Sequence, residues 1–534
     1  MGAINYSVVD SAPLVEGRWV LPSMRNLAAI TITCYTIYCL ALVIYRLFLS
    51  PLAKFPGPKL AAASDWYEVY YDLFANGGEG GAFTRHIKSL HEKYGPVVRI
   101  TPTELHLDDP EFYSEVYCAS TLSRPMDKSL KFKYRFGIPD ATFSTTYAEQ
   151  HRERRAALNP FFSKQRIRSL HDKLSEITEQ ISGRLANEYA GTGRIINAGD
   201  LWSALTMDAV STLAFGRPIN CSAMPDFRSP LSEGLQNLTW GAHWNAHFKF
   251  INDTMSTFPD KVLGALLPPF KPILDFRESI RAQVRGILSG TDTKVSTTPT
   301  LFHDIIDSRL PKSDLSLERL TDEAISVNGA GMETTKWTLT VATFYILNDP
   351  AVLANLQAEL KTAIPDPKDI LHWDELEKLP YLSGVISESL RLSYGQVQRI
   401  PRVNRLQPWN FHGHVIPPGV TVGMDSYHMH SNEKVFPYPQ SFSPERWLNN
   451  PKGPDGTRAL SNYLVSFSRG SRACIGLNLA YMELYVALAT LFRRFDLELF
   501  QTTRDDVDFA LDIVVPMPKK DTKGVRMVVK GCLD

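Results

Sequence analysis

The sequence has few cysteines and no net charge, and each of these features excludes a class of protein. Its 534 residues include six cysteines, at positions 34, 39, 118, 221, 474 and 532, and no two of them form a C-x-x-C pair. This excludes a disulfide scaffold and a cysteine-type zinc site, and it indicates a reducing compartment. Lys plus Arg and Asp plus Glu both total 57. The net charge is therefore zero, and we expect no nucleic-acid partner.

Other absences concern domain organisation. The chain has no internal repeat, no low-complexity tract and no long linker. It also lacks the G-x-G-x-x-G fingerprint of a nicotinamide- or flavin-binding unit. Length alone, at about 150 residues per domain, would suggest three domains. We expect instead one large domain without a fused nicotinamide- or flavin-binding unit.

The longest apolar run lies near the N-terminus. Residues 27–45 contain no Asp, Glu, Lys or Arg, and the run continues to Leu49 beyond Arg46. About 20 apolar residues cross a membrane as a helix, whereas the apolar region of a cleaved signal peptide has about 7–15. We therefore predict a transmembrane anchor at residues 27–49. Basic residues without acids follow it, so the positive-inside rule places residues 1–26 in the lumen and the rest in the cytoplasm.

Residues 50–60 contain three prolines around Gly57, which cannot continue a helix. They fit a stiff hinge and a simple helix stop equally well. Beyond them, residues 61–534 form one predicted domain, in which helical periodicity dominates. The predicted helices include 151–189, 301–348, 351–363, 380–393 and 477–495. Short strands are predicted at 97–100, 104–107, 420–422 and near 525–529, and a polar surface loop at 289–300. The fold class is mainly α with a minor β portion.

The segment Phe467–Gly476 reads FSRGSRACIG, and each position suits a Cys474 whose thiolate binds haem iron. Gly470 and Gly476 allow turns that bring the backbone close to a flat macrocycle. Backbone N–H groups and the start of the next helix would stabilise the thiolate, and Phe467 would keep water from it. An unreactive buried cysteine is the alternative. Chance would produce this spacing of Phe, Gly, Cys and Gly on the order of once per thousand chains of this composition.

This segment resembles the cysteine-ligand signature of the cytochrome P450 family, and the resemblance extends from the anchor to the end of the chain. It implies the fold of that family, with a haem b whose iron is bound by Cys474. In the family, a Glu and an Arg three residues apart join the Arg of a later Pro-Glu-Arg segment and brace the ligand loop. Here these residues are Glu388, Arg391 and Arg446. A solvated surface ion pair is the alternative.

Residues 330–335 read AGMETT inside a predicted helix. Glycine suits a place where a ligand approaches the backbone or the hydrogen-bond ladder opens. By resemblance, Thr334 would hydrogen-bond the bound dioxygen, and Glu333 would feed protons from solvent. The alternative is an ordinary helix with an exposed Glu and a glycine that costs about 1 kcal/mol.

The resemblance also assigns residues to the haem propionates. His151 stands where the family usually has Trp, and Arg155 follows four residues later, in register for the same role. Arg402, in Ile400-Pro401-Arg402, matches another propionate-binding arginine of the family. Arg472, beside the ligand, can pair with a propionate as well. Solvated surface side chains are the alternative for the arginines.

The implied activity is that of a monooxygenase that consumes O2 and NADPH-derived electrons. Its expected partners are a membrane-bound NADPH–cytochrome P450 reductase and, as a second candidate, cytochrome b5, at the endoplasmic reticulum membrane. One competing reading is a haem-thiolate isomerase or dehydratase that needs no O2. The other is a non-catalytic, membrane-anchored haem- or lipid-binding protein. Neither has a use for Thr334 with Glu333.

The substrate class is suggested by three further segments, FPGPKLAA, HEKYGPVVRITPTELH and RIPRV. They resemble fungal secondary-metabolism members of the family, including the oxygenases of trichothecene biosynthesis. The resemblance implies a terpenoid or polyketide intermediate. We expect residues 118–142 and 220–269 to line its pocket together with the helix at Ala330. These stretches are apolar and aromatic, which suits a hydrophobic small molecule.

Overall fold

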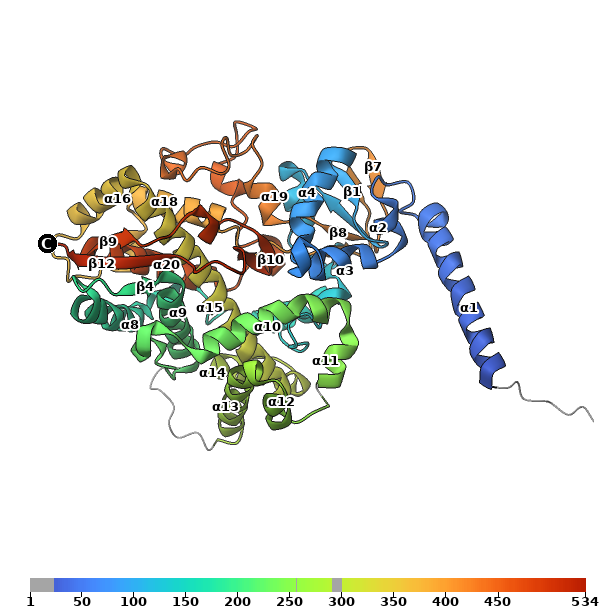
Figure 1. Cartoon of the computed structure of the whole chain (residues 1–534), viewed down its shortest axis with the longest axis horizontal. Helices are drawn as coiled ribbons and strands as arrows, with labels where there is room; N and C mark the ends of the chain where they lie inside the picture. The colour runs from blue at the N-terminus through green and yellow to red at the C-terminus, as the bar shows by residue number, and fades with distance from the viewer. Residues whose placement is uncertain (1–23, 256, 291–299) are drawn as a thin grey trace, which may run out of the picture.

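A computed structural model describes residues 24–255, 257–290 and 300–534. Figure 1 shows a helical body with its larger β-sheet at the end nearest the N-terminal helix. The expected fold class, mainly α with a minor β portion, is confirmed. Most of the predicted lumenal segment 1–26 and most of the predicted loop 289–300 lie outside the described residues.

Four helices form the centre of the body: α9 (Ala198–Phe215), α15 (Leu317–Asn348), α18 (Pro380–Leu392) and α20 (Leu477–Arg494). Their apolar side chains belong to one buried cluster. Burying a Val, Leu, Ile, Phe or Met side chain contributes about 1.5–3 kcal/mol, so this cluster fixes the relative positions of the four helices. Three of them, α15, α18 and α20, carry or adjoin the candidate site residues. The other helices of the body are α2 (Lys59–Ala63), α3 (Trp66–Leu73), α4 (Phe83–Tyr94), α5 (Tyr113–Val116), α6 (Ala148–Leu158), α7 (Lys164–Arg168), α8 (His171–Arg184), α10 (Pro230–His247), α11 (Lys249–Met255), α12 (Asp260–Leu266), α13 (Lys271–Leu288), α14 (Leu301–Ile306), α16 (Pro350–Ala363), α17 (Trp373–Leu376) and α19 (Ser426–His430).

The larger sheet has the strand order β1-β2-β8-β5-β3. Strands β2 and β8 are parallel, and the other neighbours are antiparallel. The register between β3 and β5 sets Lys128 directly opposite Arg402, so two basic side chains share one face of the sheet. Like charges in this position repel each other unless an anion lies between them. The strands of this sheet are β1 (Val97–Arg99), β2 (Glu104–Leu107), β3 (Met126–Lys128), β5 (Arg402–Asn404) and β8 (Thr421–Gly423).

The remaining strands form smaller units. A three-stranded sheet has the order β4-β12-β9, and two hairpins pair β6 with β7 and β10 with β11. The predicted strand near 525–529 is β12, the central strand of its sheet. These strands are β4 (Ile195–Asn197), β6 (Trp409–Phe411), β7 (His414–Ile416), β9 (Phe495–Leu499), β10 (Leu511–Ile513), β11 (Val515–Met517) and β12 (Arg526–Cys532).

Two helices predicted as continuous are interrupted. The prediction for 151–189 is wrong because α6 ends before Pro160, and Ser163 then caps α7 by accepting a hydrogen bond from the Arg166 N–H. The prediction for 301–348 is wrong because Pro311 separates α14 from α15. Buried apolar residues continue on both sides of each break, so apolar spacing alone does not reveal the breaks. The other predicted helices agree with the structure within about one residue.

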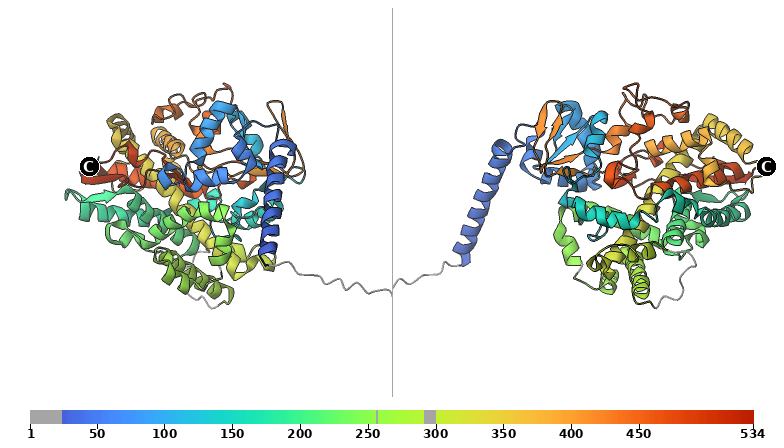
Figure 2. Two further views of the ribbon diagram at one scale, coloured as in Figure 1. Left: turned by 45° about the vertical axis from the view of Figure 1, so that its right-hand side comes forward. Right: turned by 180° about the vertical axis from the view of Figure 1, so that it is seen from behind.

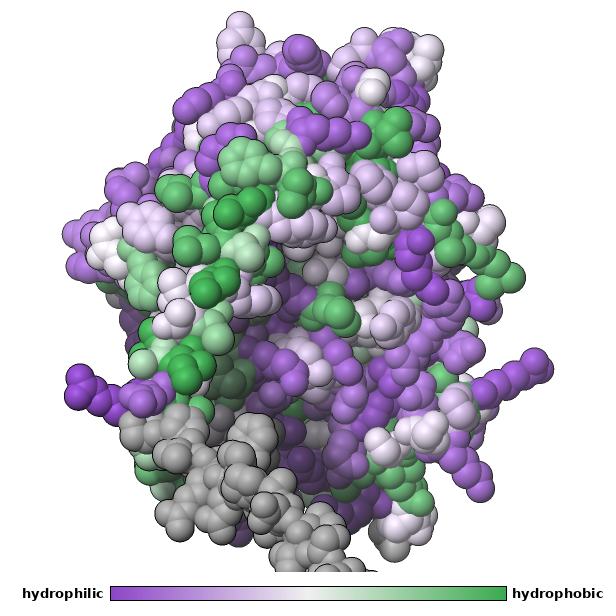
Figure 3. All heavy atoms as spheres, turned by 90° about the vertical axis from the view of Figure 1, so that its right-hand side faces the viewer, coloured by the Kyte–Doolittle hydropathy of each residue, from purple (hydrophilic) through white to green (hydrophobic). Residues whose placement is uncertain are grey.

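Helix α1 (Met24–Ile44) stands away from the body and continues as a π-helical turn, η1 (Tyr45–Leu49). Together they span 26 residues, with a stretch of mean hydropathy 2.2 that is not buried against the protein. Figure 2 shows this helix apart from the body in the view from behind, and Figure 3 shows its apolar side chains as a green column. Its length and composition suit a membrane span, beginning three residues before the predicted anchor.

Residues 50–60 are held against the larger sheet. Leu52 and Phe55 are buried. The Arg99 N–H donates to the Pro56 carbonyl at 2.7 Å, and Arg99 Nη1 donates to the Arg46 carbonyl at 2.8 Å. At Gly57, where φ is +153°, a Cβ atom would overlap the Arg99 carbonyl. These contacts favour the stiff hinge over the simple helix stop.

Candidate active site

Cys474 lies in a cavity at the N-terminal end of α20. The Cys474 N–H donates to the Phe467 carbonyl at 2.8 Å and closes the loop around the thiol. The Gly476 backbone lies close to the sulfur and lowers the pKa of the thiol. Phe467 lines the cavity, with its ring 5.3 Å from that of Tyr481. Among the described residues that line this cavity, Cys474 is the sole cysteine, so it is the only thiol placed to bind a metal there.

Three influences set the pKa of the Cys474 thiol. Burial raises its pKa, whereas the Gly476 N–H and the positive charge of Arg155 act in the opposite direction. The net shift is upward, so the protein by itself favours the neutral thiol. A bound metal cation deprotonates a coordinating thiol. The site therefore suits a thiolate that forms together with metal binding.

The two glycines of the loop have different roles from those expected. Gly470 adopts φ +71°, and a Cβ there would overlap the Cys118 carbonyl. Gly470 does not line the cavity, so glycine is required at this position by the contact between two loops and not by the approach of a macrocycle. Gly476 does line the cavity, and a Cβ there would lie 3.9 Å from the Cys474 sulfur.

One face of α15 forms another wall of the cavity. Ala330, Gly331 and Thr334 line it. The helix stays regular through these residues, and Thr334 Oγ1 donates to the Ala330 carbonyl at 2.8 Å. A Cβ on Gly331 would lie 2.6 Å from Val210 Cγ2. The glycine therefore permits α9 to pack closely on α15, and the hydrogen-bond ladder does not open as its presence had suggested.

Glu333 does not line the cavity. Its carboxylate accepts hydrogen bonds from Lys336 Nζ at 2.8 and 2.7 Å, and the residue is 6% exposed. Glu333 points about 100° away from Thr334 around the helix axis, on the side of α15 that does not line the cavity. The structure therefore brings Thr334 to the cavity and leaves Glu333 behind it, buried and paired. The alternative reading of an exposed Glu is also wrong.

Basic side chains form a further part of the cavity lining. His151, Arg155 and Arg472 line it together with Lys128, and Arg402 lies opposite Lys128 in the sheet. Within the described part of the chain, none of these five forms an ion pair with an acid. We call them the cation cluster. Because buried charges without partners are costly, such a cluster indicates that an anionic group belongs there.

The pKa shifts of the cation cluster agree with this interpretation. Burial lowers the pKa of His151 to about 2, and the charges of Arg472, Lys128 and Arg155 add to the effect. Burial also lowers the pKa of Lys128 well below its ordinary value and that of Arg472 to about 9. Each group is thus made harder to protonate by its neighbours. A bound dianion would reverse these shifts by favouring the charged forms.

The arginines of the cluster also hold the backbone around the cavity. Arg472 donates to the carbonyls of Met126, Thr145 and Thr146 at 2.7–3.0 Å. Arg155 Nη1 donates to the Ala473 carbonyl at 2.8 Å. Arg402 is 2% exposed and does not line the cavity, since its Nη1 donates to the Ile400 carbonyl at 2.8 Å. A guanidinium has five N–H donors, so each of them retains donors for a further partner.

Glu388, Arg391 and Arg446 meet as the resemblance implied. Arg391 binds Glu388 through two hydrogen bonds of 2.7 and 2.8 Å, and both residues are completely buried. Arg446 Nε lies 3.4 Å from Glu388, and Trp447 Nε1 donates to the same carboxylate at 2.9 Å. This pairing is not the solvated surface pair of the alternative reading.

The same residues are connected to the cysteine loop. Arg391 also donates to the carbonyls of His430, Pro439 and Ser441. The Val465 N–H donates to His430 Nε2 at 2.9 Å, and Ser466 Oγ donates to the Leu390 carbonyl at 2.8 Å. Residues 465–466 lead directly into the cysteine loop, so the buried pair supports the position of Cys474.

Sequence reasoning missed two residues of the cavity. Lys128 belongs to no sequence motif, and only the register of β3 and β5 places it opposite Arg402. Glu483 lies on α20, is 1% exposed and lines the cavity. Burial raises the pKa of its carboxyl well above the ordinary value, although a hydrogen bond with Thr335 opposes the shift. An acid within the apolar stripe of the helix predicted at 477–495 was the available signal.

The expected pocket lining is correct only in part. From the region 118–142, Lys128 and Thr142 line the cavity, and Phe143 follows them. No described residue of 220–269 lines it. Helix α10 packs instead against α13, and His243 of α10 donates to the Asp512 carbonyl through Nε2. The tertiary packing therefore places α10 outside the cavity wall.

These residues fit the haem expected from the sequence. A single sulfur donor suits an axial thiolate, and a cation cluster without acids suits the two carboxylates of the macrocycle. The cavity separates these elements from the Thr334 face of α15. All of them are contributed by one chain.

Comparison with known proteins agrees with this geometry. The cytochrome P450 family matches residues 66–523. The chain is 40% identical over 508 residues to the cytochrome P450 monooxygenase sdnE of Sordaria araneosa, with 93% of this chain and 97% of that protein covered. It is 41% identical over 499 residues to the cytochrome P450 monooxygenase orf6 of Eupenicillium brefeldianum, with 92% and 97% covered. It is also 36% identical over 519 residues to the tryptophan 6-hydroxylase fscE of Fusarium equiseti, with 96% and 100% covered.

The family match includes α15, the buried pair of α18 and the cysteine loop, so it covers every residue of the candidate site. The relatives are oxygen-incorporating oxidoreductases by name, and they align over nearly their whole length. The expectation of a haem-thiolate monooxygenase is thereby confirmed. This chain belongs to the cytochrome P450 family.

Proposed function

We propose that this protein binds haem b through Cys474 and inserts one oxygen atom from O2 into a hydrophobic intermediate of fungal secondary metabolism. The observation that carries the proposal is the arrangement of one cavity. Cys474 is the sole thiol among the described residues that line this cavity. The Thr334 face of α15 and the cation cluster, which contains no acid, border the same cavity. When bound, a haem with a thiolate ligand supplies the activation of dioxygen by favouring O–O cleavage.

The protein supplies the ligand of the haem iron, orients the haem and excludes water from the thiolate. Cys474 supplies the thiolate, and Phe467 covers it on the side of the loop. His151, Arg155, Lys128 and Arg472 would hold the propionates, and Arg402 on the adjacent strand would add positive charge that attracts them. Neutral His151 can donate one N–H, so it can replace the usual Trp in this role.

Thr334 would hold a proton near the bound oxygen, because its hydroxyl is on the cavity wall. Glu333 would supply protons to Thr334 from behind the wall. In the structure Lys336 holds the carboxylate of Glu333, so that ion pair must open for the transfer. Glu333→Gln therefore tests the relay separately from Thr334.

Thr334→Ala is expected to separate NADPH consumption from product formation. The substitution removes a positioned proton donor, and such donors contribute about 10²–10⁴-fold to a reaction. We expect at least about a 10-fold fall in product per NADPH oxidised, with haem content unchanged. The matched control is Thr340→Ala, because Thr340 makes the same backbone hydrogen bond at 2.8 Å but does not line the cavity. Equal coupling in both variants would remove Thr334 from the mechanism.

Lys128→Met is expected to weaken haem binding and to stabilise the haem-free protein. A charge-assisted hydrogen bond contributes about 1.5–3 kcal/mol, so haem retention should fall by about 10-fold or more. Without haem, the same change removes a buried cation that has no acidic partner. Haem loss and the thermal midpoint of the haem-free protein measure the two effects. Lys133→Met, a change outside the cavity, is the control, and tight haem binding by Lys128→Met would exclude the propionate role.

The membrane arrangement follows from α1 and the hinge. We place α1 across the endoplasmic reticulum membrane, with residues 1–26 in the lumen and the haem domain in the cytoplasm. Trp66, Phe74 and Trp244 are exposed, and ring contacts join Trp66 to Phe248 and Phe74 to Trp244. Aromatic side chains are enriched at membrane–water interfaces, so these residues support a membrane-facing surface near the hinge. In this location, NADPH–cytochrome P450 reductase is the expected electron donor, and cytochrome b5 is a second candidate.

The substrate class rests on the cavity lining and on the relatives. Phe143, Val327 and Ala330 form an apolar wall, with Ser326 as a polar group beside them. Such a lining suits a compact hydrophobic molecule with few polar groups. Among the relatives, fscE is named for tryptophan, so the family includes aromatic substrates too. We favour a terpenoid or polyketide intermediate.

Microsomes that contain the protein and its reductase provide the test. A panel of terpenoids, polyketides and indoles is screened for substrate-induced shifts of the haem spectrum, and each positive compound is incubated with NADPH under ¹⁸O2. One labelled oxygen atom in the product is the expected result. A product without label, formed without NADPH, would favour an isomerase or dehydratase, and binding without any product would favour a non-catalytic haem- or lipid-binding protein.

A further inference from the structure

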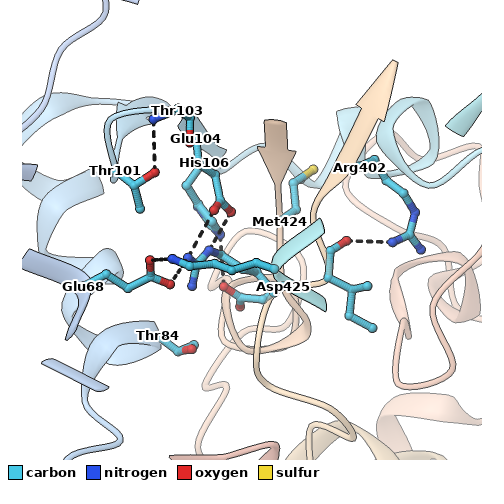
Figure 4. Close-up of polar contacts among 12 residues, drawn as sticks. Glu68, Thr84, Thr101, Thr103, Glu104, His106, Arg402, Met424 and Asp425 are labelled. Atoms are coloured by element: carbon cyan, nitrogen blue, oxygen red, sulfur yellow. Dashed lines mark hydrogen bonds and ion pairs between the residues drawn. The ribbon is translucent and has the colours of Figure 1, made fainter. Parts of the chain in front are cut away.

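A buried group of histidines lies beside the active-site cavity and has no role in the proposed reaction. His91 comes from α4, His106 from β2 and His428 from α19, and all three are buried. One ring nitrogen of each lies within 4.8 Å of the other two. Figure 4 shows His106 above Asp425, which follows Met424, while Arg402 lies to the other side of Met424. Asp425 itself lines the cavity.

The hydrogen bonds of the three rings determine where their protons are. His91 Nδ1 lies 2.8 Å from the Gly95 carbonyl, which can only accept, so this nitrogen carries a proton. His106 Nε2 lies 3.1 Å from the Asp425 carboxylate, and His428 Nδ1 lies 2.9 Å from it. The Asp425 carboxylate also accepts a hydrogen bond from the backbone N–H of His428 at 2.9 Å. Asp425 is therefore an acceptor, and both histidine nitrogens that face it are donors.

In the neutral state, each ring therefore keeps one lone pair, at His91 Nε2, His106 Nδ1 and His428 Nε2. His91 Nε2 and His106 Nδ1 are 2.7 Å apart, although neither carries a proton in the neutral state. His428 Nε2 is buried and has no hydrogen-bond partner in the described structure. A cation that accepts three lone pairs would satisfy all three nitrogens.

We propose that His91 Nε2, His106 Nδ1 and His428 Nε2 bind one Zn²⁺ ion. Three imidazoles are a common donor set for zinc, with a water molecule as the fourth ligand. Zn–N distances of about 2.0–2.1 Å in tetrahedral geometry require nitrogens roughly 3.3 Å apart. The closest pair, at 2.7 Å, must open slightly, and the widest separation, within 4.8 Å, must close. Small side-chain rotations that change the distances between the nitrogens by up to about 1.5 Å achieve both.

The surroundings are those of a metal site and not of a histidine surface patch. Asp425 accepts from two of the rings and the Gly95 carbonyl from the third, and such outer hydrogen bonds orient zinc-binding histidines and increase their basicity. With Asp425 ionised, the zinc site would carry a net charge of +1. Asp108 and Lys88 are the other charged groups that act on these rings. Nitrogen donors favour Zn²⁺ over Mg²⁺ and Ca²⁺, which prefer oxygen.

Zinc at this position would join parts of the chain that are far apart in sequence. α4 and β2 belong to the N-terminal part of the fold, whereas His428 is two residues from His430, which contacts Arg391 and Val465. The ion would therefore attach the sheet to the segment that supports the cysteine loop. It would stabilise the fold without taking part in oxygen chemistry.

The test uses the full-length haem-containing protein, purified without a polyhistidine tag, loaded with ZnCl2 and desalted. Plasma mass spectrometry then gives the ratio of zinc to haem iron, which we expect to be about 1. His428→Asn keeps a donor for Asp425 but removes Nε2, and the ratio should fall to below about 0.1. His91→Gln should give the same loss. The matched control is His86→Gln, on the same helix, because His86 bonds to Tyr67 and not to the cluster.

A second measurement guards against variants that fold poorly. The carbon-monoxide difference band reports correctly bound haem and must match the wild type in each variant used. Chelation should lower the unfolding midpoint of the wild type and of His86→Gln but not that of His428→Asn. The proposal is overturned if the loaded wild type retains less than about 0.1 zinc per iron, or if His428→Asn retains as much as the wild type. Both results are independent of monooxygenase activity.

Discussion

Cys474→Ala is expected to abolish both the haem-thiolate absorption band of the reduced carbon-monoxide complex and all product formation. No other cysteine among the described residues lines the cavity, so no neighbouring thiol can replace the missing ligand. The methyl group of alanine cannot donate electrons to iron, whereas electron donation by the thiolate favours O–O cleavage. Difference spectroscopy on microsomes and product analysis with added reductase measure the two losses.

The control for this substitution is Cys118→Ala. Cys118 lies near the loop, since its backbone carbonyl is next to Gly470, but its side chain does not line the cavity. We expect Cys118→Ala to keep the thiolate band and the activity. A wild-type band in Cys474→Ala would show that another residue binds the iron, and the proposed function would have to be abandoned.

The second large effect is expected at the buried pair of α18. Glu388→Gln leaves Arg391 as a buried cation without its partner, and breaking a buried ion pair in this way costs about 3–5 kcal/mol. Arg391 would still donate to the carbonyls of His430, Pro439 and Ser441. The support of the cysteine loop is nevertheless weakened, so we expect both a lower thermal midpoint and a smaller fraction of protein with bound haem.

The exposed pair of Lys378 with Glu375 provides the comparison. Its side chains are 64% and 57% exposed, and such pairs contribute about 0–1 kcal/mol. Glu375→Gln should therefore leave the thermal midpoint and the haem content nearly unchanged. Arg391→Lys keeps the charge but loses the two-point contact with Glu388, so it should resemble Glu388→Gln. If Glu388→Gln were as stable as Glu375→Gln, the pair would have no bracing role.

Several features of the fold follow directly from short stretches of sequence. The apolar run that forms α1 and the cysteine loop before α20 are local, and each was predicted nearly to the residue. Glu388 and Arg391 are three residues apart, so helix geometry alone puts them on one face. The interruptions near Pro160 and Pro311 were local as well, but apolar residues on both sides concealed them.

Other features depend on contacts that no short stretch contains. Whether Glu333 or Thr334 faces the cavity depends on the rotation of α15, which is determined by the close packing of α9 against Gly331. Helix α10 lies outside the cavity wall because it packs on α13. Gly470 serves a contact with Cys118, more than three hundred residues earlier in the chain.

The sequence by itself predicted the apolar N-terminal helix, the cysteine loop, the order of the family's landmarks and the chemistry that they imply. Only the tertiary structure decided that Lys128 lies opposite Arg402, that Glu333 is paired behind the cavity wall, and that His91, His106 and His428 meet. The physical reason is that spacing along a helix or strand fixes which side chains share a face. The partner across that face is chosen by strand register and by the packing of the core, which involve the whole chain at once.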